Sequence, residues 1–254
     1  MLTIALSKGR ILKQTLPLLE KAELSISEKE LQSRKLVLDT NLDEIKVIIL
    51  RASDVPVFVQ HGAADLGIAG KDVLLEHGAN GVFELIDLGI SKCKLMVASK
   101  PDQELNKGTL KVATKYVKST KAYFHSQGRQ VEIIKLSGAM ELAPIVGLAD
   151  CIVDLVDTGN TLKANNLIPI ELIQNISSRL IVNSASFNTK HSQINDWLDK
   201  IKDNLRSINY LHIMKILTLN SPPCFLGKVF LIMTSTKLSM KLLLRFKIKG
   251  TKPF

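Results

Sequence analysis

Two carboxylates and two hydroxyls lie close together at the end of one short apolar segment, residues 151–156. Asp154 and Asp157 are three residues apart, and Thr-Gly-Asn-Thr follows at 158–161. The spacing predicts a buried strand, a turn and the start of a helix. Free N–H groups and threonine hydroxyls at such a helix start can hold a phosphate, and the glycine lets the backbone come close. The two carboxylates could accept hydrogen bonds from a sugar diol or hold a hydrated Mg²⁺. On these residues alone, an ordinary strand-turn-helix with threonine caps remains an alternative.

A second candidate anion site lies near the start of the chain, in the turn Ser7-Lys8-Gly9-Arg10. Apolar residues at 3–6 predict a strand, and the spacing of apolar residues from 11 to 19 predicts a helix for which Ser7 is the expected N-cap. The cations of Lys8 and Arg10 would then join the helix N-terminus in attracting phosphate oxygens. Two solvated charges on a turn are the alternative at this point.

Other sites are not indicated by the sequence. The five histidines are scattered without ligand spacing, and we interpret them as surface or capping residues. Gly-x-Ser-x-Gly, Walker A and Gly-x-Gly-x-x-Gly are absent, which argues against hydrolase, P-loop and dinucleotide-binding classes. Cys93, Cys151 and Cys224 are too far apart to indicate a zinc site or a disulfide framework.

The net charge of +10 belongs mainly to the end of the chain. Eight of the 34 Lys and Arg residues, and none of the 24 Asp and Glu residues, lie from Ser207 onward, so residues 1–206 carry a net charge of only +2. This distribution and the 5% aromatic content argue against a nucleic-acid partner. Because Met1 leads directly into a predicted strand and long apolar runs are absent, we expect a cytoplasmic protein without a membrane partner.

Predicted strands and helices alternate along most of the chain, which favours an α/β fold with mainly parallel sheets. We expect an N-cap at Ser53, a boundary loop at 100–108 and a final helix at 192–205. The predicted strands are 3–6, 36–38, 46–50, 65–69, 82–88, 94–98, 110–114, 131–136, 151–156, 168–176 and 178–182.

Five motifs, in unbroken order within residues 1–206, resemble the ATP phosphoribosyltransferase family. They are Ser7-Lys8-Gly9-Arg10, Arg51-Ala52-Ser53-Asp54-Val55-Pro56, the segment from Gly62 to Asp72, Met140-Glu141-Leu142-Ala143-Pro144, and the segment from Asp154 to Leu162. The resemblance implies two α/β lobes like those of type II periplasmic binding proteins, with a central cleft. One lobe would be 1–93 plus 184–206, and the other 94–183.

The resemblance also implies the reaction and its residues. ATP would attack phosphoribosyl pyrophosphate through N1 of adenine, giving phosphoribosyl-ATP and pyrophosphate in the first step of histidine biosynthesis. Mg²⁺ would be carried by substrate phosphates, with no firm protein ligand. Arg10 and Arg34 would be catalytic. The residues implied for ATP and pyrophosphate are Lys8, Gly9, Arg10, Arg34, Arg51, Cys93 and Lys94, and those for phosphoribosyl pyrophosphate are Glu141, Asp154, Asp157, Thr158, Gly159, Asn160 and Thr161.

The chain resembles the short form of the family, because residues 208–254 lack the strand and helix alternation of a regulatory domain. The resemblance implies a homodimer of catalytic subunits and a regulatory subunit similar to histidyl-tRNA synthetase, together forming a hetero-octamer. The basic tail at 207–254 fits neither form. A reading-frame extension, a disordered appendage and a weak membrane-surface anchor are its open interpretations, and we favour the first two. A non-catalytic two-lobed protein that binds small anions is the rival function.

Overall fold

The computed structural model describes residues 1–78, 80–103, 105 and 108–219, with side chains described as far as residue 205. Contacts between residues divide the chain into two compact units, Met1–Asn204 and Leu205–Phe254. Most of the basic tail expected at 207–254 therefore falls outside the described residues, and only its first part, to Leu219, belongs to a described helix. Among the described residues, no helix has the length and apolar character needed to cross a membrane.

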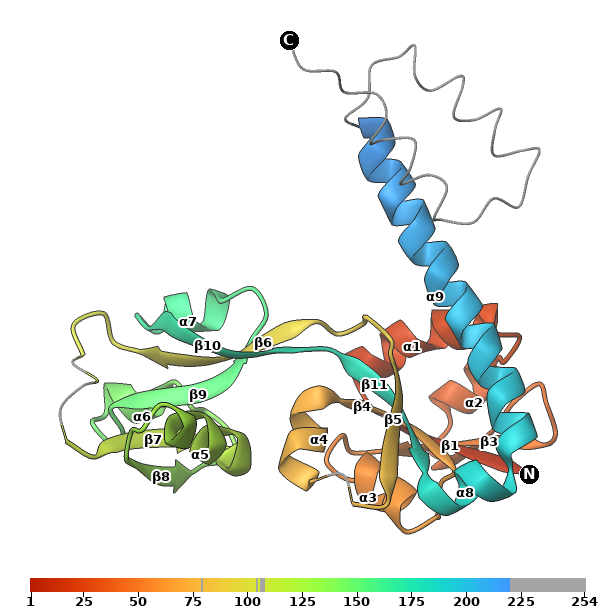
Figure 1. The fold of residues 1–254 in the computed structure, drawn as a ribbon, viewed down its shortest axis with the longest axis horizontal. Helices are drawn as coiled ribbons and strands as arrows, with labels where there is room; N and C mark the ends of the chain where they lie inside the picture. Colours follow the sequence, from red (N-terminus) through yellow and green to blue (C-terminus); the bar gives the residue numbers. More distant parts are fainter. Residues whose placement is uncertain (79, 104, 106–107, 220–254) are drawn as a thin grey trace. The chain divides into compact units, whose positions relative to one another are not determined.

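The first sheet has six strands in the order β2-β3-β1-β4-β11-β5 (Figure 1). Its centre is parallel, because β1 pairs with β3 and with β4 in the same direction. The strands β2, β11 and β5 join this centre in antiparallel pairs. The strand bounds are β1 Leu2–Ser7, β2 Val37–Asp39, β3 Ile45–Leu50, β4 Leu66–Gly70, β5 Val82–Asp87 and β11 Ser178–Asn183.

Apolar side chains of β1, β4 and β11 form a core with helix α3. Gly67 of β4 is required there, since a Cβ atom at this position would lie 2.7 Å from a methyl of Val59 and 2.9 Å from one of Val55. The helices associated with this part of the chain are α1 Arg10–Lys21, α2 Glu28–Gln32, α3 Val55–Gln60, α4 Lys71–His77, α8 Ser184–Thr189 and α9 His191–Leu219.

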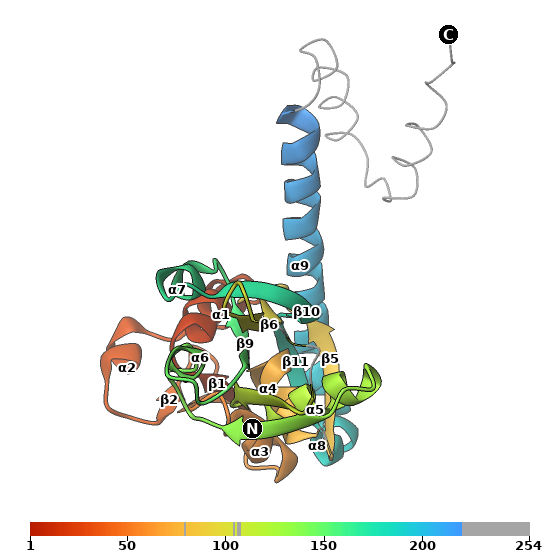
Figure 2. The same cartoon turned by 90° about the vertical axis from the view of Figure 1, so that its left-hand side faces the viewer.

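The second sheet has five strands in the order β10-β6-β9-β7-β8. Pairs β7·β8 and β7·β9 are parallel, whereas β6 pairs antiparallel with β9 and β10. Helix α5 covers one face through the buried Phe124, while α6 and α7 cover the other, around Met140, Ile152 and Leu162 (Figure 2). The bounds are β6 Cys93–Ser99, β7 Leu110–Thr114, α5 Val117–Ser126, β8 Val131–Lys135, α6 Leu142–Ile145, β9 Cys151–Val156, α7 Asn160–Ala164 and β10 Ile168–Ile176.

The predicted α/β architecture with two sheets is confirmed, and parallel pairing occurs at the centre of the first sheet, in β3-β1-β4, and on one side of the second, in β9-β7-β8. The other pairs in both sheets are antiparallel. Strand β11 pairs with β4 and β5, so the chain returns to the first sheet at Ser178, before the expected return at 184. The short helices α2 and α8 were not predicted, and α9 continues beyond the predicted end at 205.

Two predicted helix caps are wrong. Helix α1 begins after Gly9, whose φ of 88° lets the backbone turn out of β1, and Ser7 instead remains the last residue of the strand. Helix α3 has Asp54 at its N-cap position without a side-chain cap, and the Ser53 hydroxyl donates to the Asp54 carboxylate at 2.8 Å. The N-cap preference of serine predicts both caps, but local backbone geometry overrides that preference here.

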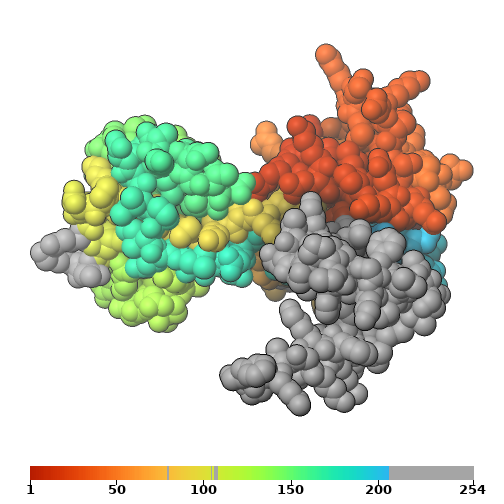
Figure 3. All heavy atoms as spheres, turned by 90° about the horizontal axis from the view of Figure 1, so that it is seen from above, coloured from red at the N-terminus to blue at the C-terminus, as the bar shows by residue number. Residues whose placement is uncertain are grey.

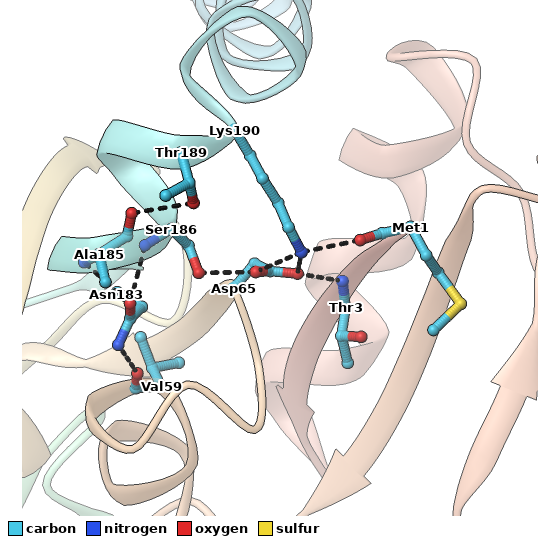
Figure 4. Close-up of polar contacts among 9 residues, drawn as sticks. All are labelled: Met1, Thr3, Val59, Asp65, Asn183, Ala185, Ser186, Thr189 and Lys190. Carbon is cyan, nitrogen blue, oxygen red and sulfur yellow. Dashed lines mark hydrogen bonds and ion pairs between the residues drawn. The ribbon is translucent and has the colours of Figure 1, made fainter.

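A buried carboxylate joins the start of the chain to its return segment (Figure 4). Asp65 is 5% exposed and accepts hydrogen bonds from the Thr3 backbone N–H at 2.8 Å and the Ser186 hydroxyl at 2.6 Å. The Lys190 ammonium lies 2.8 and 2.9 Å from the two Asp65 oxygens and also donates to the Met1 carbonyl at 2.8 Å. Burial opposes the charge of Asp65, but these partners outweigh it and hold its pKa below the usual value.

We predict that Asp65→Asn lowers the free energy of unfolding by about 2 kcal/mol at pH 7, because it leaves Lys190 without its charged partner. A carboxyl with a lowered folded-state pKa stabilises the fold above its usual pKa of 3.8 and loses that effect as the pH falls through the folded value. Urea unfolding at pH 7 and at lower pH should show the difference from wild type narrowing with acidification. Asp199→Asn, at a side chain that is 71% exposed, is the matched control and should be neutral. A difference that is constant with pH would contradict this prediction.

Candidate functional site

The predicted phosphate loop forms one wall of a pocket of about 160 Å³. Strand β9 carries Asp154 toward this pocket, and the loop after β9 turns at Gly159, whose φ of 78° is left-handed, into α7. The Thr158 hydroxyl accepts a weak hydrogen bond of 3.4 Å from the Asn160 N–H. All seven residues predicted for phosphoribosyl pyrophosphate line this pocket, namely Glu141, Asp154, Asp157, Thr158, Gly159, Asn160 and Thr161.

A second pocket, of about 190 Å³, is lined by residues at the ends of β1 and β4, by the first turns of α1 and α4, and by residues of the second-sheet strands β6, β9 and β10. Lys8 and Arg10 line it, as predicted for a site that attracts anions, and so does Cys93. Ser7 and Ser178 also line it, and their hydroxyls are buried without a hydrogen-bond partner among the described residues. The pocket therefore has two cationic residues in its lining and two serines whose buried hydroxyls are unsatisfied.

Arg10 connects the two pockets. Its Nη1 forms an ion pair with Asp157 Oδ2, and its Nη2 donates to the Ser91 carbonyl at 3.2 Å. Figure 3 shows the red N-terminal segment meeting the green segment of the second sheet, consistent with this ion pair. The cationic turn after β1 and the acid-flanked loop after β9 thus lie side by side.

Ser91, in the connection between the two sheets, has a φ of 51°, which is unusual for a residue other than glycine. Gln14 of α1 holds it there, because its Oε1 accepts from the Ser91 N–H at 2.6 Å and from the Ser91 hydroxyl at 3.1 Å. Helix α1 therefore fixes both Ser91 and the guanidinium that contacts its carbonyl. Residues held in strained backbone conformations often occur at functional sites.

Burial alters the acids of the two pockets. It raises the pKa of Asp154, and the nearby Glu141 carboxylate adds to the rise, while the Leu155 N–H and the Lys115 ammonium oppose it. Burial likewise raises the pKa of Asp72, which accepts a 3.3 Å hydrogen bond from the Tyr116 hydroxyl. Carboxyl groups with raised pKa values in a cleft are typical of functional sites.

A second contact links α4 of the first sheet to α5 of the second. The Glu76 carboxylate accepts hydrogen bonds from the backbone N–H groups of Lys118 and Ser119, at 3.0 and 2.8 Å, and from the Ser119 hydroxyl at 2.7 Å. A carboxylate from another element thus caps the first turn of α5. The hydrogen bond from the Tyr116 hydroxyl to Asp72 joins the same two elements, so α4 and the start of α5 are linked at two places.

The remaining predicted site residues lie outside both pocket linings. Arg34 is exposed in the loop between α2 and β2, Arg51 is exposed after β3, and Lys94 is exposed on β6 beside Val156. Gly9 is the N-cap of α1, between the pocket-lining Lys8 and Arg10. The assignment of these four residues to ATP and pyrophosphate stays a prediction.

Sequence reasoning missed four residues of the site, namely Gln14, Asp72, Ser91 and Lys115. Lys115 directly follows the predicted strand 110–114 and Asp72 lies three residues after the predicted strand 65–69, so a position near a strand end was the available signal. Gln14 and Ser91 gave no signal, because their roles arise from contact between residues 77 positions apart. Among the described residues, no group of three His, Cys, Asp or Glu side chains is arranged to hold a metal ion.

Comparison with known proteins gives consistent results. A family model described as ATP phosphoribosyltransferase matches residues 51–203. A relative of that name from Vesicomyosocius okutanii is 71% identical over 205 residues, which cover 81% of this chain and 100% of the relative. Another from Pseudomonas aeruginosa is 57% identical over 203 residues, covering 80% of this chain and 96% of the relative.

Solved structures agree with these relatives. The ATP phosphoribosyl transferase (HisG:HisZ) complex from Thermotoga maritima contains a chain with a TM-score of 0.72 and 31% identity, covering 82% of this chain and 100% of that one. The periplasmic aliphatic sulphonate binding protein SsuA from Escherichia coli has a TM-score of 0.52 at 14% identity. The match covers 89% of this chain and 81% of the SsuA chain. The second similarity concerns the fold alone, and it confirms the predicted resemblance to periplasmic binding proteins.

We predict that Gly9→Ala lowers the free energy of unfolding by about 1–2 kcal/mol, because alanine resists the combination of φ 88° and ψ −138°. A methyl group at this position would have no atom within 4 Å, so the cost comes from the backbone rather than from a clash. Gly138→Ala is the matched control, since that glycine also has open space but no positive φ. Equal unfolding midpoints in urea for the two variants would contradict the prediction.

Proposed function

Because the chain belongs to the ATP phosphoribosyltransferase family, we propose that it transfers the phosphoribosyl group of phosphoribosyl pyrophosphate to N1 of the adenine of ATP. The products are phosphoribosyl-ATP and pyrophosphate, and the reaction opens histidine biosynthesis. The 205 residues that match the relative from Vesicomyosocius okutanii cover that relative's whole length, so the chain corresponds to the short form of the family.

The observation that best supports the assignment of substrates is the Arg10–Asp157 ion pair. It joins a pocket rich in carboxylates and hydroxyls, which suits a phosphorylated sugar, to a pocket with a cationic rim, which suits pyrophosphate and nucleotide phosphates. The 5′-phosphate would bind at Thr158–Thr161, with the ribose hydroxyls at Asp154 and Asp157. The pyrophosphate would extend toward Arg10 and Lys8.

The proposed chemistry needs no general base, since adenine N1 already carries a lone pair. The difficult step is the departure of pyrophosphate, during which negative charge grows on the leaving group while the ribose becomes cationic. Cations placed in advance stabilise the first change, and carboxylates beside the ribose stabilise the second. We assign the first role to Arg10, with Arg34 approaching when substrate is bound, and the second to Asp154 and Asp157.

A divalent cation is expected for this family, and we propose Mg²⁺. Carboxylate and hydroxyl oxygens line the first pocket and are the kind of ligand that Mg²⁺ prefers, but the described residues contain no group of three acidic, His or Cys side chains that would hold the ion by themselves. Bound Mg²⁺ would neutralise part of the pyrophosphate charge. We propose that substrate phosphates hold it, with the oxygen-lined wall nearby and no protein ligand assigned.

We further propose that the enzyme works in the cytoplasm as homodimers joined to a histidyl-tRNA-synthetase-like regulatory subunit in a hetero-octamer. The similar chain from Thermotoga maritima belongs to a complex of two proteins, which supports a regulatory partner. Cys93 and Cys151 are free thiols, as expected in a reducing compartment. The rival function, a non-catalytic anion-binding protein, is favoured only by the fold, whereas the relatives of high identity favour the enzyme.

The proposed activity is tested by mixing the purified chain with ATP, phosphoribosyl pyrophosphate and Mg²⁺, with and without the regulatory subunit of a relative. We expect phosphoribosyl-ATP to form and chelation of the metal to stop its formation. Tight binding of either substrate without product under every condition would favour the rival function.

We predict that Arg10→Ala lowers kcat by about 10²–10³, the usual effect of removing one preorganised donor to a developing negative charge. Arg34→Ala should also lower kcat if Arg34 approaches the leaving group when substrate is bound. Lys13→Ala, at an exposed position on α1, is the control for surface charge and should retain normal turnover. Steady-state kinetics of the three variants test this prediction. Near-normal turnover of Arg10→Ala would show that Arg10 does not stabilise the leaving group.

A further inference from the structure

Lys115 lies beside the proposed ribose site, although no motif of the sequence marks it. It directly follows β7, and its Nζ is 3.7 Å from Oδ1 of Asp154. The register of the parallel pair β7·β9 places Thr114 opposite Val153. The residues that follow them, Lys115 and Asp154, therefore lie next to each other at the same end of the two strands. The pairing of Lys115 with Asp154 therefore follows from strand register.

The backbone around Lys115 is held firmly. The buried Thr114 hydroxyl donates to the Val153 carbonyl at 2.7 Å and accepts from the Tyr116 N–H at 2.9 Å. These two bonds tie the turn after β7 to the strand that carries Asp154. The position of Lys115 relative to Asp154 is thus fixed by a buried hydrogen-bonded link rather than by the lysine alone.

The side chain of Lys115 also rests on a buried aromatic ring. Its Nζ is 4.9 Å from the ring centroid of Tyr116, which is 4% exposed and donates its hydroxyl to Asp72. Such a cation–π contact limits the motion of a long side chain that is otherwise 44% exposed. The ring therefore directs the ammonium toward the pocket of Asp154.

The pocket beside Lys115 is lined by three carboxylates, so a cation at this position changes its electrostatics. Glu141, Asp154 and Asp157 all line the pocket that the proposed function assigns to an anionic sugar phosphate. Arg10 pairs with Asp157 and Lys115 with Asp154, so two of the three carboxylates have a cation of their own. Without these cations the carboxylates would repel the ligand and one another.

We propose that Lys115 is a positioning residue for phosphoribosyl transfer, which orients the Asp154 carboxylate toward the ribose hydroxyls and offsets its repulsion of the substrate phosphates. This inference rests on the proposed function, because Asp154 is assigned there to the ribose. Lys115 acts through Asp154, and it belongs to the sugar site rather than to the ATP site.

The test compares Lys115→Met with Lys115→Arg, using steady-state kinetics for both substrates and calorimetric binding of phosphoribosyl pyrophosphate. For the methionine variant we expect KM and Kd for phosphoribosyl pyrophosphate to rise roughly three- to tenfold, the range of one partly screened ion pair, with KM for ATP unchanged. The arginine variant should recover most of the affinity. Lys121→Met, an exposed lysine on α5, is the control and should bind as wild type does.

Asp154→Asn separates failure of the inference from failure of the proposed function. If Asp154→Asn weakens binding of phosphoribosyl pyrophosphate while Lys115→Met leaves it unchanged, the role of Lys115 is overturned and the ribose site stands. If Asp154→Asn also binds normally, the ribose assignment fails and the inference fails with it. A Lys115→Met variant that raises KM for ATP equally and lowers the urea midpoint would show a general structural role, which also overturns the proposal.

Discussion

The ion pair between Arg10 and Asp157 is the contact on which the proposed site depends. Both side chains are about half exposed, at 46% and 56%, so the pair itself adds little to stability. A weak exposed pair is well suited to an active site, because an incoming phosphate can replace the carboxylate as the partner of the guanidinium at small cost. Other hydrogen bonds hold the surrounding elements in place. Gln14 binds Ser91, and Glu76 caps the first turn of α5. These contacts join elements of the first sheet to elements of the second, or to the connection between them, and so help to place Arg10 beside Asp157.

The same combination of a buried hydrogen-bonded support and a partly exposed ion pair recurs at the pocket lined by Asp154. Thr114 ties β7 to β9 through a buried hydrogen bond, whereas Lys115 and Asp154 meet at 3.7 Å near the surface. Preorganised charges stabilise a transition state only if they need little rearrangement during the reaction. A hydrogen-bonded scaffold that holds partly exposed charged groups in place meets that requirement.

The sequence predicted most strands, because short apolar runs between turns give a strong signal at the centre of parallel sheets. It also predicted the turn at residues 158–161 between a strand and a helix, and these adjacent residues line one pocket. It could not predict the antiparallel addition of β11 to the first sheet, since pairing partners are not encoded by the pattern of a single strand. For the same reason it missed Ser91 and Asp72, whose partners Gln14 and Tyr116 are distant in the chain.

The similarity to a sulphonate-binding protein shows that this architecture alone does not decide between binding and catalysis. A binding protein gains from stabilising its ligand as it is, whereas a transferase gains from charges that match the ligand only as its bonds change. Carboxylates beside a phosphate loop are a poor arrangement for holding an anion, because they repel it. They are a good arrangement for a ribose that becomes cationic as pyrophosphate leaves. The acids at positions 141, 154 and 157 are therefore better explained by phosphoribosyl transfer than by storage of an anion.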